Sequence, residues 1–143
     1  MLRPSREYFD HTGDVGVRLT APSLPELFRQ ALLAFTEILT DSSTLNATAV
    51  ESVTIQADAL DDLLVEWLNE LLYRFEVRNL LPVDVEVQVS ESDKVCTLTA
   101  RIQSEPFTAA RHPIKVLIKG VTYHQLEVHR TAHGCETSVV FDI

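Results

Sequence analysis

The sequence is short of basic residues, glycine and cysteine, and each shortage excludes a class of protein. Twelve Lys and Arg against 21 Asp and Glu give a net charge of −9, so the chain lacks the positive surplus with which proteins bind RNA or anionic membranes. With only four glycines and no phosphate-binding glycine motif, a nucleotide cradle is not expected. Cys96 and Cys135 lie far apart without metal-ligand spacing, which favours reduced thiols in the cytoplasm.

Long apolar runs are also missing. None approaches the ~20 residues that a membrane-spanning helix needs, and the first residues become charged too soon for a secretory signal. The length of 143 residues and the 45% hydrophobic content are typical of one globular domain. No linker, repeat or low-complexity tract interrupts the chain. We therefore expect a single cytoplasmic domain over residues 1–143.

Two segments have the apolar spacing of amphipathic helices. The first covers residues 24–40 and begins after Ser23, a favourable N-cap. The second covers roughly residues 59–76, with Asp58 as the expected cap and Trp67 within the apolar stripe. Core packing is the expected role of this tryptophan.

The remaining segments alternate with the period of β-strands. The helices occur early and most strands late, which predicts an α+β fold with two amphipathic helices packed on one face of a mainly antiparallel sheet. The expected strands cover residues 7–10, 15–19, 50–57, 83–89, 95–102, 115–122, 125–131 and 136–142.

Polar residues at predicted strand ends are the candidates for chemistry. Asp14 lies in a turn, and Asp142 is followed by Ile143. If the fold brings them together, two carboxylates and a main-chain or terminal oxygen make an all-oxygen site of the kind that Ca²⁺ or Mg²⁺ prefers. An Asp in a polar turn is more often an Asx-turn or cap, so both interpretations stay open at this point.

The histidines allow a second interpretation. His11 or His124 with Asp14 would serve as base and orienting acid in a small phosphoester hydrolase. The plainer interpretation of His11, His112 and His124 is an exposed or hydrogen-bonded histidine. Cys96 falls within a predicted strand, where a buried, unreactive thiol is expected.

Four segments resemble the archease family. Residues 8–17 read Tyr-Phe-Asp-His-Thr-Gly-Asp-Val-Gly-Val and resemble the family's N-terminal signature, in which Ala usually stands at position 13. The likeness continues through residues 64–73 and 119–124, the latter reading Lys-Gly-Val-Thr-Tyr-His, and ends at residues 140–143, Val-Phe-Asp-Ile. These segments occur in the family's order and cover nearly the whole chain.

The resemblance implies a function without catalysis. Archeases activate the GTP- and manganese-dependent RNA ligase of tRNA splicing and RNA repair, promoting its guanylylation and multiple turnover. By position, the family's divalent-metal site corresponds to Asp14, Asp142 and Ile143, with Ca²⁺ expected ahead of Mg²⁺ or Mn²⁺. The surrounding functional tip would include Asp10, His11, His112 and His124.

The ligase is the expected partner, and RNA would be contacted only indirectly, since the chain and RNA are both strongly negative. Two other classes of function remain open from the residues alone. One is the His/Asp hydrolase, and the other is a general chaperone-like interaction module that uses an exposed apolar or acidic face.

Overall fold

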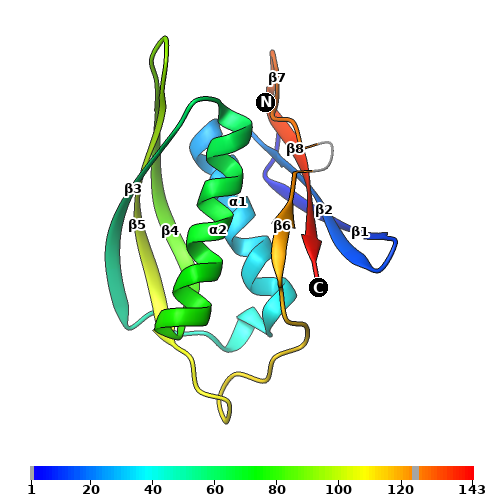
Figure 1. The fold of residues 1–143 in the computed structure, drawn as a ribbon, viewed down its shortest axis with the longest axis vertical. Coiled ribbons are helices and arrows are strands. Elements are labelled where there is room, and N and C mark those ends of the chain that lie inside the picture. The colour runs from blue at the N-terminus through cyan, green and yellow to red at the C-terminus, as the bar shows by residue number, and fades with distance from the viewer. Residues whose placement is uncertain (1, 124–125) are drawn as a thin grey trace.

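The protein, in a computed structural model that describes residues 2–123 and 126–143, places two helices between two antiparallel sheets (Figure 1). A five-stranded sheet has the order β1-β2-β8-β6, and β7 also pairs with β8. Its strands are β1 (Ser5–His11), β2 (Asp14–Ala21), β6 (Gly120–Thr122), β7 (His129–Thr131) and β8 (Gly134–Asp142). A three-stranded sheet has the order β3-β5-β4, with β3 (Ala49–Ala57), β4 (Leu80–Glu91) and β5 (Cys96–Pro106).

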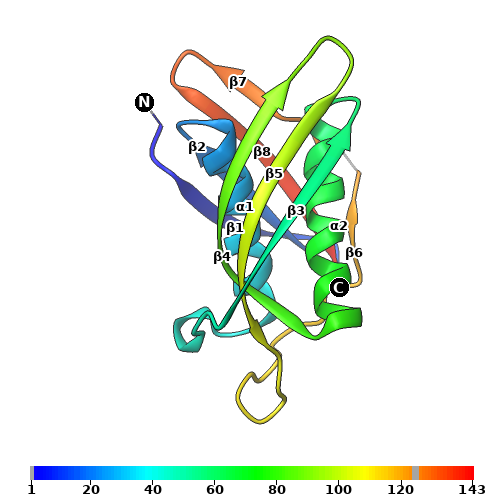
Figure 2. The same ribbon diagram turned by 90° about the vertical axis from the view of Figure 1, so that its left-hand side faces the viewer.

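The helices are α1 (Leu24–Leu39) and α2 (Leu60–Arg78), with a short 3₁₀ turn η1 (Ser42–Thr44) after α1. The α+β class and the antiparallel pairing are confirmed. The arrangement differs in one respect, because the strands form two sheets rather than one. Both helices contact strands of each sheet, and Figure 2 shows the three-stranded sheet in front of them. Alternation along a strand predicts which side is buried but not which strand lies beside it.

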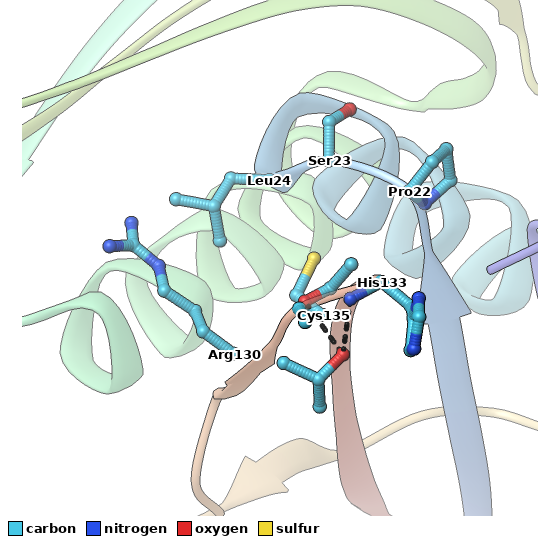
Figure 3. Close-up of a pocket in the computed structure, with 9 residues that line it drawn as sticks. Pro22, Ser23, Leu24, Arg130, His133 and Cys135 are labelled. Atoms are coloured by element: carbon cyan, nitrogen blue, oxygen red, sulfur yellow. Dashed lines mark hydrogen bonds between the residues drawn. The ribbon is translucent and has the colours of Figure 1, made fainter. Parts of the chain in front are cut away.

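The start of α1 follows the prediction from the sequence. Ser23, labelled at the start of the helix in Figure 3, occupies the N-cap with extended backbone. Its Oγ accepts a hydrogen bond from the backbone N–H of Glu26 at 3.4 Å. The helix ends at Leu39, where the backbone N–H of Thr40 donates to the carbonyl of Thr36. The Ser23 cap satisfies one of the backbone N–H groups of the first turn that have no partner within the helix.

The predicted cap of α2 is wrong. Ala59, not Asp58, occupies the N-cap and makes no side-chain capping bond, because the helix begins one residue later than a cap at Asp58 requires. The carboxylate of Asp61 in the first turn instead accepts a hydrogen bond from the backbone N–H of Val128 at 2.7 Å. The helix ends at Asn79, whose φ of 54° is the left-handed conformation common at helix C-termini.

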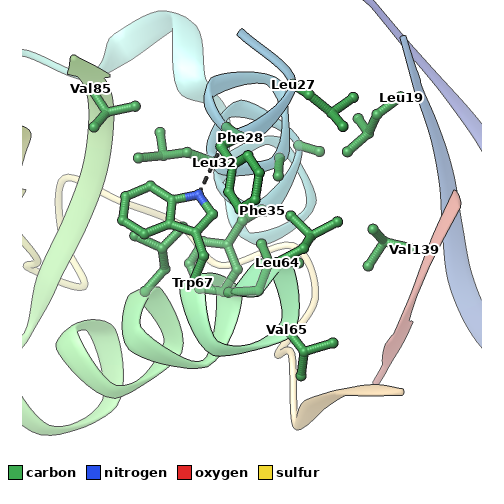
Figure 4. Close-up of a cluster of buried hydrophobic side chains, with 14 of the residues drawn as sticks. Leu19, Leu27, Phe28, Leu32, Phe35, Leu64, Val65, Trp67, Val85 and Val139 are labelled. Carbon is green, nitrogen blue, oxygen red and sulfur yellow. Dashed lines mark hydrogen bonds between the residues drawn. The ribbon is translucent and has the colours of Figure 1, made fainter. Parts of the chain in front are cut away.

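Trp67 is the centre of the core, as predicted. Its side chain is fully buried, and its indole Nε1–H donates to the carbonyl of Phe28 on α1 at 3.0 Å (Figure 4). This bond satisfies the one polar atom of a large apolar group. Cys96 is buried as expected, and burial raises the pKa of its thiol. Other large, fully buried side chains of the core include Phe28, Phe35, Phe141, Leu32, Leu64 and Leu68.

The strands expected over residues 115–122 and 125–131 are shorter in the structure. β6 begins only at Gly120, because the preceding segment is bound to the end of α1. There Ile114 forms an isolated bridge with Thr40, and the backbone N–H of Lys115 donates to the carbonyl of Leu39 at 2.7 Å. β7 covers only residues 129–131. Neither described helix has the combination of length and apolar character needed to cross a membrane.

Candidate functional site

A tight hairpin between β1 and β2 carries the first candidate residues. Thr12 and Gly13 form its two-residue turn with φ values of 41° and 87°. Positive φ at both positions is the geometry of a type I′ turn, which Gly adopts without strain. His11 therefore ends β1 directly opposite Asp14, the first residue of β2.

The pairing of β2 with β8 brings the predicted carboxylates together. Val15 lies opposite Phe141 in this antiparallel ladder, so the next pair toward the hairpin turn is Asp14 with Asp142. Val15 and Phe141 pack toward the core, so the alternation of a strand turns Asp14 and Asp142 to the outer face. Figure 1 shows the C-terminal end of β8 beside the β1–β2 hairpin. The register therefore runs toward Asp14 and Asp142, the two carboxylates singled out from the sequence.

His11 extends the same row. Its Nδ1 lies 3.9 Å from Oδ2 of Asp14, and the two side chains are 39% and 27% exposed. Opposite Asp142 on its other side lies Gly120 of β6, which adds no side chain. We call His11, Asp14 and Asp142 the hairpin row. Two carboxylates directly opposite each other repel, and this repulsion is relieved by any cation that they share.

One main-chain carbonyl at the end of β8 already accepts a hydrogen bond within the protein. The carbonyl of Asp142 accepts a hydrogen bond from the backbone N–H of Lys119 at 2.7 Å. This leaves Ile143, which is half-buried, to supply the backbone oxygen of the expected site. Among the described residues, no three or more His, Cys, Asp or Glu side chains converge on one point in the way a metal ion requires.

Asp10 does not belong to the hairpin row. It pairs with Val15, whose side chain packs toward the core, and residues directly opposite each other in a ladder share one face. Asp10 therefore points to the inner face of the sheet, toward α1, while Asp14 points to the outer face. Tyr8, two residues earlier on the same side, confirms this direction because its hydroxyl donates to the carboxylate of Glu37 on α1. His124 lies outside the described residues.

His112 is buried in the loop after β5 and not at the hairpin row. Only 1% of its surface is exposed, and its ring stacks on Phe107 at a centroid distance of 5.8 Å. Its Nδ1 accepts a hydrogen bond from the backbone N–H of Thr108 at 3.0 Å, and Nε2 lies 3.2 Å from Oε2 of Glu105. These contacts give His112 a role in holding the loop together.

Glu105 is the buried acid at the centre of that loop. Burial alone raises the pKa of its carboxyl, but bonds from the backbone N–H of Asn46 and from Arg111, with the contact to His112, outweigh burial and lower the pKa to about 2. The ionised form is thus strongly preferred in the folded protein. No local pattern in the sequence indicates this cluster, because Asn46 and Glu105 are far apart in the chain.

A pH dependence follows for stability. A carboxyl with a depressed pKa stabilises the fold fully above its ordinary value of 4.5, and this contribution disappears as the pH falls from 4.5 toward about 2. We expect Glu105→Gln to melt at a lower temperature than the parent at pH 7, with the difference narrowing between pH 5 and pH 2.5. Thermal melts at several pH values check this. A difference that is constant over this range would contradict the assignment.

A bridge between β1 and α1 was not predicted from the sequence. The guanidinium of Arg6 donates to both carboxylate oxygens of Glu37, at 2.9 and 2.8 Å, and Tyr8 donates to the same carboxylate. The bonds from Arg6, opposed by partial burial, hold the pKa of Glu37 below its usual value. The bridge fixes β1, and with it the hairpin row, against the C-terminal half of α1.

Three comparisons with known proteins agree on one family. The family model described as the archease protein family (MTH1598/TM1083) matches residues 7–143. The chain is 33% identical to protein archease of Methanosarcina barkeri over 96% of this chain and 94% of the relative, and 34% identical to that of Archaeoglobus fulgidus over 95% and 97%.

A solved structure supports the same grouping. The solution structure of Methanobacterium thermoautotrophicum protein 1598 superposes with a TM-score of 0.83 at 28% identity and covers 96% of this chain and 98% of that one. The match to the family model includes most of β1, the hairpin row and β8. The chain belongs to the archease family.

Proposed function

We propose that this protein activates a GTP- and manganese-dependent RNA-splicing ligase and is an accessory factor rather than an enzyme. Family membership supports a role as a factor related to RNA ligation. The observation that carries the proposal is the β2–β8 register, in which Val15 lies opposite Phe141, so that Asp14 and Asp142 come next along the two strands. Both residues belong to the segments by which the sequence resembles archeases.

The hairpin row suits a divalent cation. Asp14 and Asp142 would hold it with their carboxylates, and the main-chain oxygen of Ile143 would complete an all-oxygen set. A bound cation supplies positive charge at a tip that is otherwise acidic. The chain's own part would be to hold two like charges side by side, and the β2–β8 ladder and the Arg6–Glu37 bridge support this role.

The charge of the chain supports protein rather than RNA as the direct partner. A net charge of −9 opposes RNA phosphates and complements a protein that must itself handle RNA. We propose that RNA is reached only through the ligase, and that both proteins meet in the cytoplasm.

The hydrolase alternative gains no support from the geometry. His11 and Asp14 are both substantially exposed, and neither lines the cavities beside Cys135, Lys115 or His129. An enzyme of this kind requires a concave pocket that surrounds its substrate. No described feature favours a general chaperone over the specific activator.

Removing the last two residues tests the proposal. A chain that ends at Phe141 keeps the inward-facing residues of β8 but loses Asp142 and Ile143. We expect calorimetry with Ca²⁺ or Mn²⁺ to show at least about tenfold weaker binding and ligase turnover to fall to the level of the ligase alone. Unchanged metal binding and full activation would show that the tip is not the functional site.

A further inference from the structure

The inner side of the β1–β2 hairpin faces a groove that the proposed cation site does not use. This groove has a volume of about 640 Å³ and lies between the hairpin, the C-terminal end of α1 and residues 115–116. Its apolar floor consists of Val15, Ile38 and Val116, and Tyr8, which is 46% exposed, forms one wall. We call it the hairpin groove.

The charges around the hairpin groove leave an unbalanced negative side. Arg6 neutralises Glu37, and the ammonium of Lys115 acts on the nearby Asp41 carboxylate and lowers its pKa, after the larger effect of the Ser43 hydrogen bonds. Asp10 lies across the ladder from Val15, on the groove side of the sheet, and is exposed. In the described part of the chain no basic side chain forms an ion pair with it.

The lining of the groove is itself more acidic than basic. The carboxylates of Glu37 and Asp41 line it together with one ammonium, that of Lys115, and the last turn of α1 carries no basic residue. Asp10 adds a further carboxylate beside this lining, because it lies directly across the β1–β2 ladder from Val15 of the floor. A long cationic side chain suits such a surface, because its alkyl part covers apolar groups while its charged head stays at the rim.

We propose that the hairpin groove binds a lysine or arginine side chain of the ligase, with the charged head at Asp10 and the alkyl part on Val15 and Val116. The identity of the partner rests on the proposed function. The two sides of one hairpin then have separate tasks. The outer side, with Asp14 and Asp142, holds a cation, and the inner side, with Asp10, docks the partner.

Two substitutions in the groove test this, each with a matched control. We expect Asp10→Asn to weaken ligase binding about threefold, and Val116→Lys about tenfold, at low salt. Asp93→Asn, in the β4–β5 turn of the other sheet, and Val50→Lys, on the exposed outer face of β3, should change binding less than about twofold. Metal binding by Asp10→Asn, measured by calorimetry, should stay within about twofold of the parent. Equal affinity of parent and groove variants, or equal losses in the controls, would overturn the proposal.

A probe without the ligase separates this inference from the proposed function. Acetyl-valyl-arginine amide at millimolar concentration should shift the backbone amide NMR signals of Val15, Ile38 and Val116, and acetyl-valyl-glutamate amide should not. If the arginine peptide shifts these signals but the ligase is neither bound nor activated, the hairpin groove does prefer a cationic side chain and the proposed partner is wrong. If the ligase is activated but the peptide shifts nothing, the groove proposal alone is wrong.

Discussion

Asp14→Asn is expected to remain folded and to lose ligase activation. Asparagine keeps the shape of the side chain and its capacity for an Asx-turn beside Thr12 and Gly13, but it removes one of the two carboxylates in the hairpin row. Loss of a charged oxygen ligand should weaken Ca²⁺ or Mn²⁺ binding by at least about tenfold. Ligase turnover should fall to that of the ligase alone.

Stability separates this result from simple unfolding. The side chain of Asp14 is partly exposed, so replacing it costs at most about 1 kcal/mol of folding free energy, and relief of repulsion with Asp142 offsets part of that cost. A thermal melt and a metal titration should accompany the ligation assay, with Asp93→Asn as the control for loss of one negative charge. An Asp14→Asn protein that melts like the parent and activates fully would mean that the turn aspartate has only a structural role.

Trp67→Ala should produce the largest loss of stability of any substitution considered. Removing a fully buried indole leaves a cavity between α1 and α2, which costs about 3–5 kcal/mol. The carbonyl of Phe28 also loses the hydrogen bond that it accepts from Nε1. For a domain of this size the melting temperature should fall by roughly 10–20 °C.

Two further variants divide this loss into its parts. Trp67→Phe retains most of the apolar volume but not the N–H donor, and we expect it to lose about 1–3 kcal/mol. Tyr73→Ala, on the exposed side of the same helix and 51% exposed, should lose less than about 1 kcal/mol. Chemical denaturation measures all three. A loss for Trp67→Ala no greater than that for Tyr73→Ala would contradict the assigned core.

The elements with long periodic patterns could be predicted from the sequence, and their partners could not. The apolar stripes of α1 and α2 and the Ser23 cap are local features, so they appeared directly in the residue spacing. The division into two sheets depends on contacts between distant strands, which alternation does not encode. The same limit applies to Asp58, because a shift of one residue in the helix start removes a cap.

The candidate site also combines features that are local in the sequence with contacts between distant segments. The hairpin turn around Gly13 and the position of Asp142 were visible in the sequence, but only the β2–β8 ladder shows that the strand ends carrying Asp14 and Asp142 lie side by side. Asp10 was grouped with the tip because it is adjacent in sequence, whereas the alternation of β1 turns it to the other face. His112 was grouped by motif position, and the structure gives it contacts with Glu105, Phe107 and Thr108.

One measurement tests the central claim most directly. The GTP- and manganese-dependent ligase is supplied at a concentration well below that of its RNA substrate, and ligated product per ligase molecule is counted with and without this protein. The proposed function predicts many turnovers with the protein and about one without it, and no change in the anisotropy of labelled RNA when the ligase is omitted. Equal turnover in both reactions, or tight RNA binding by the protein alone, would contradict the account.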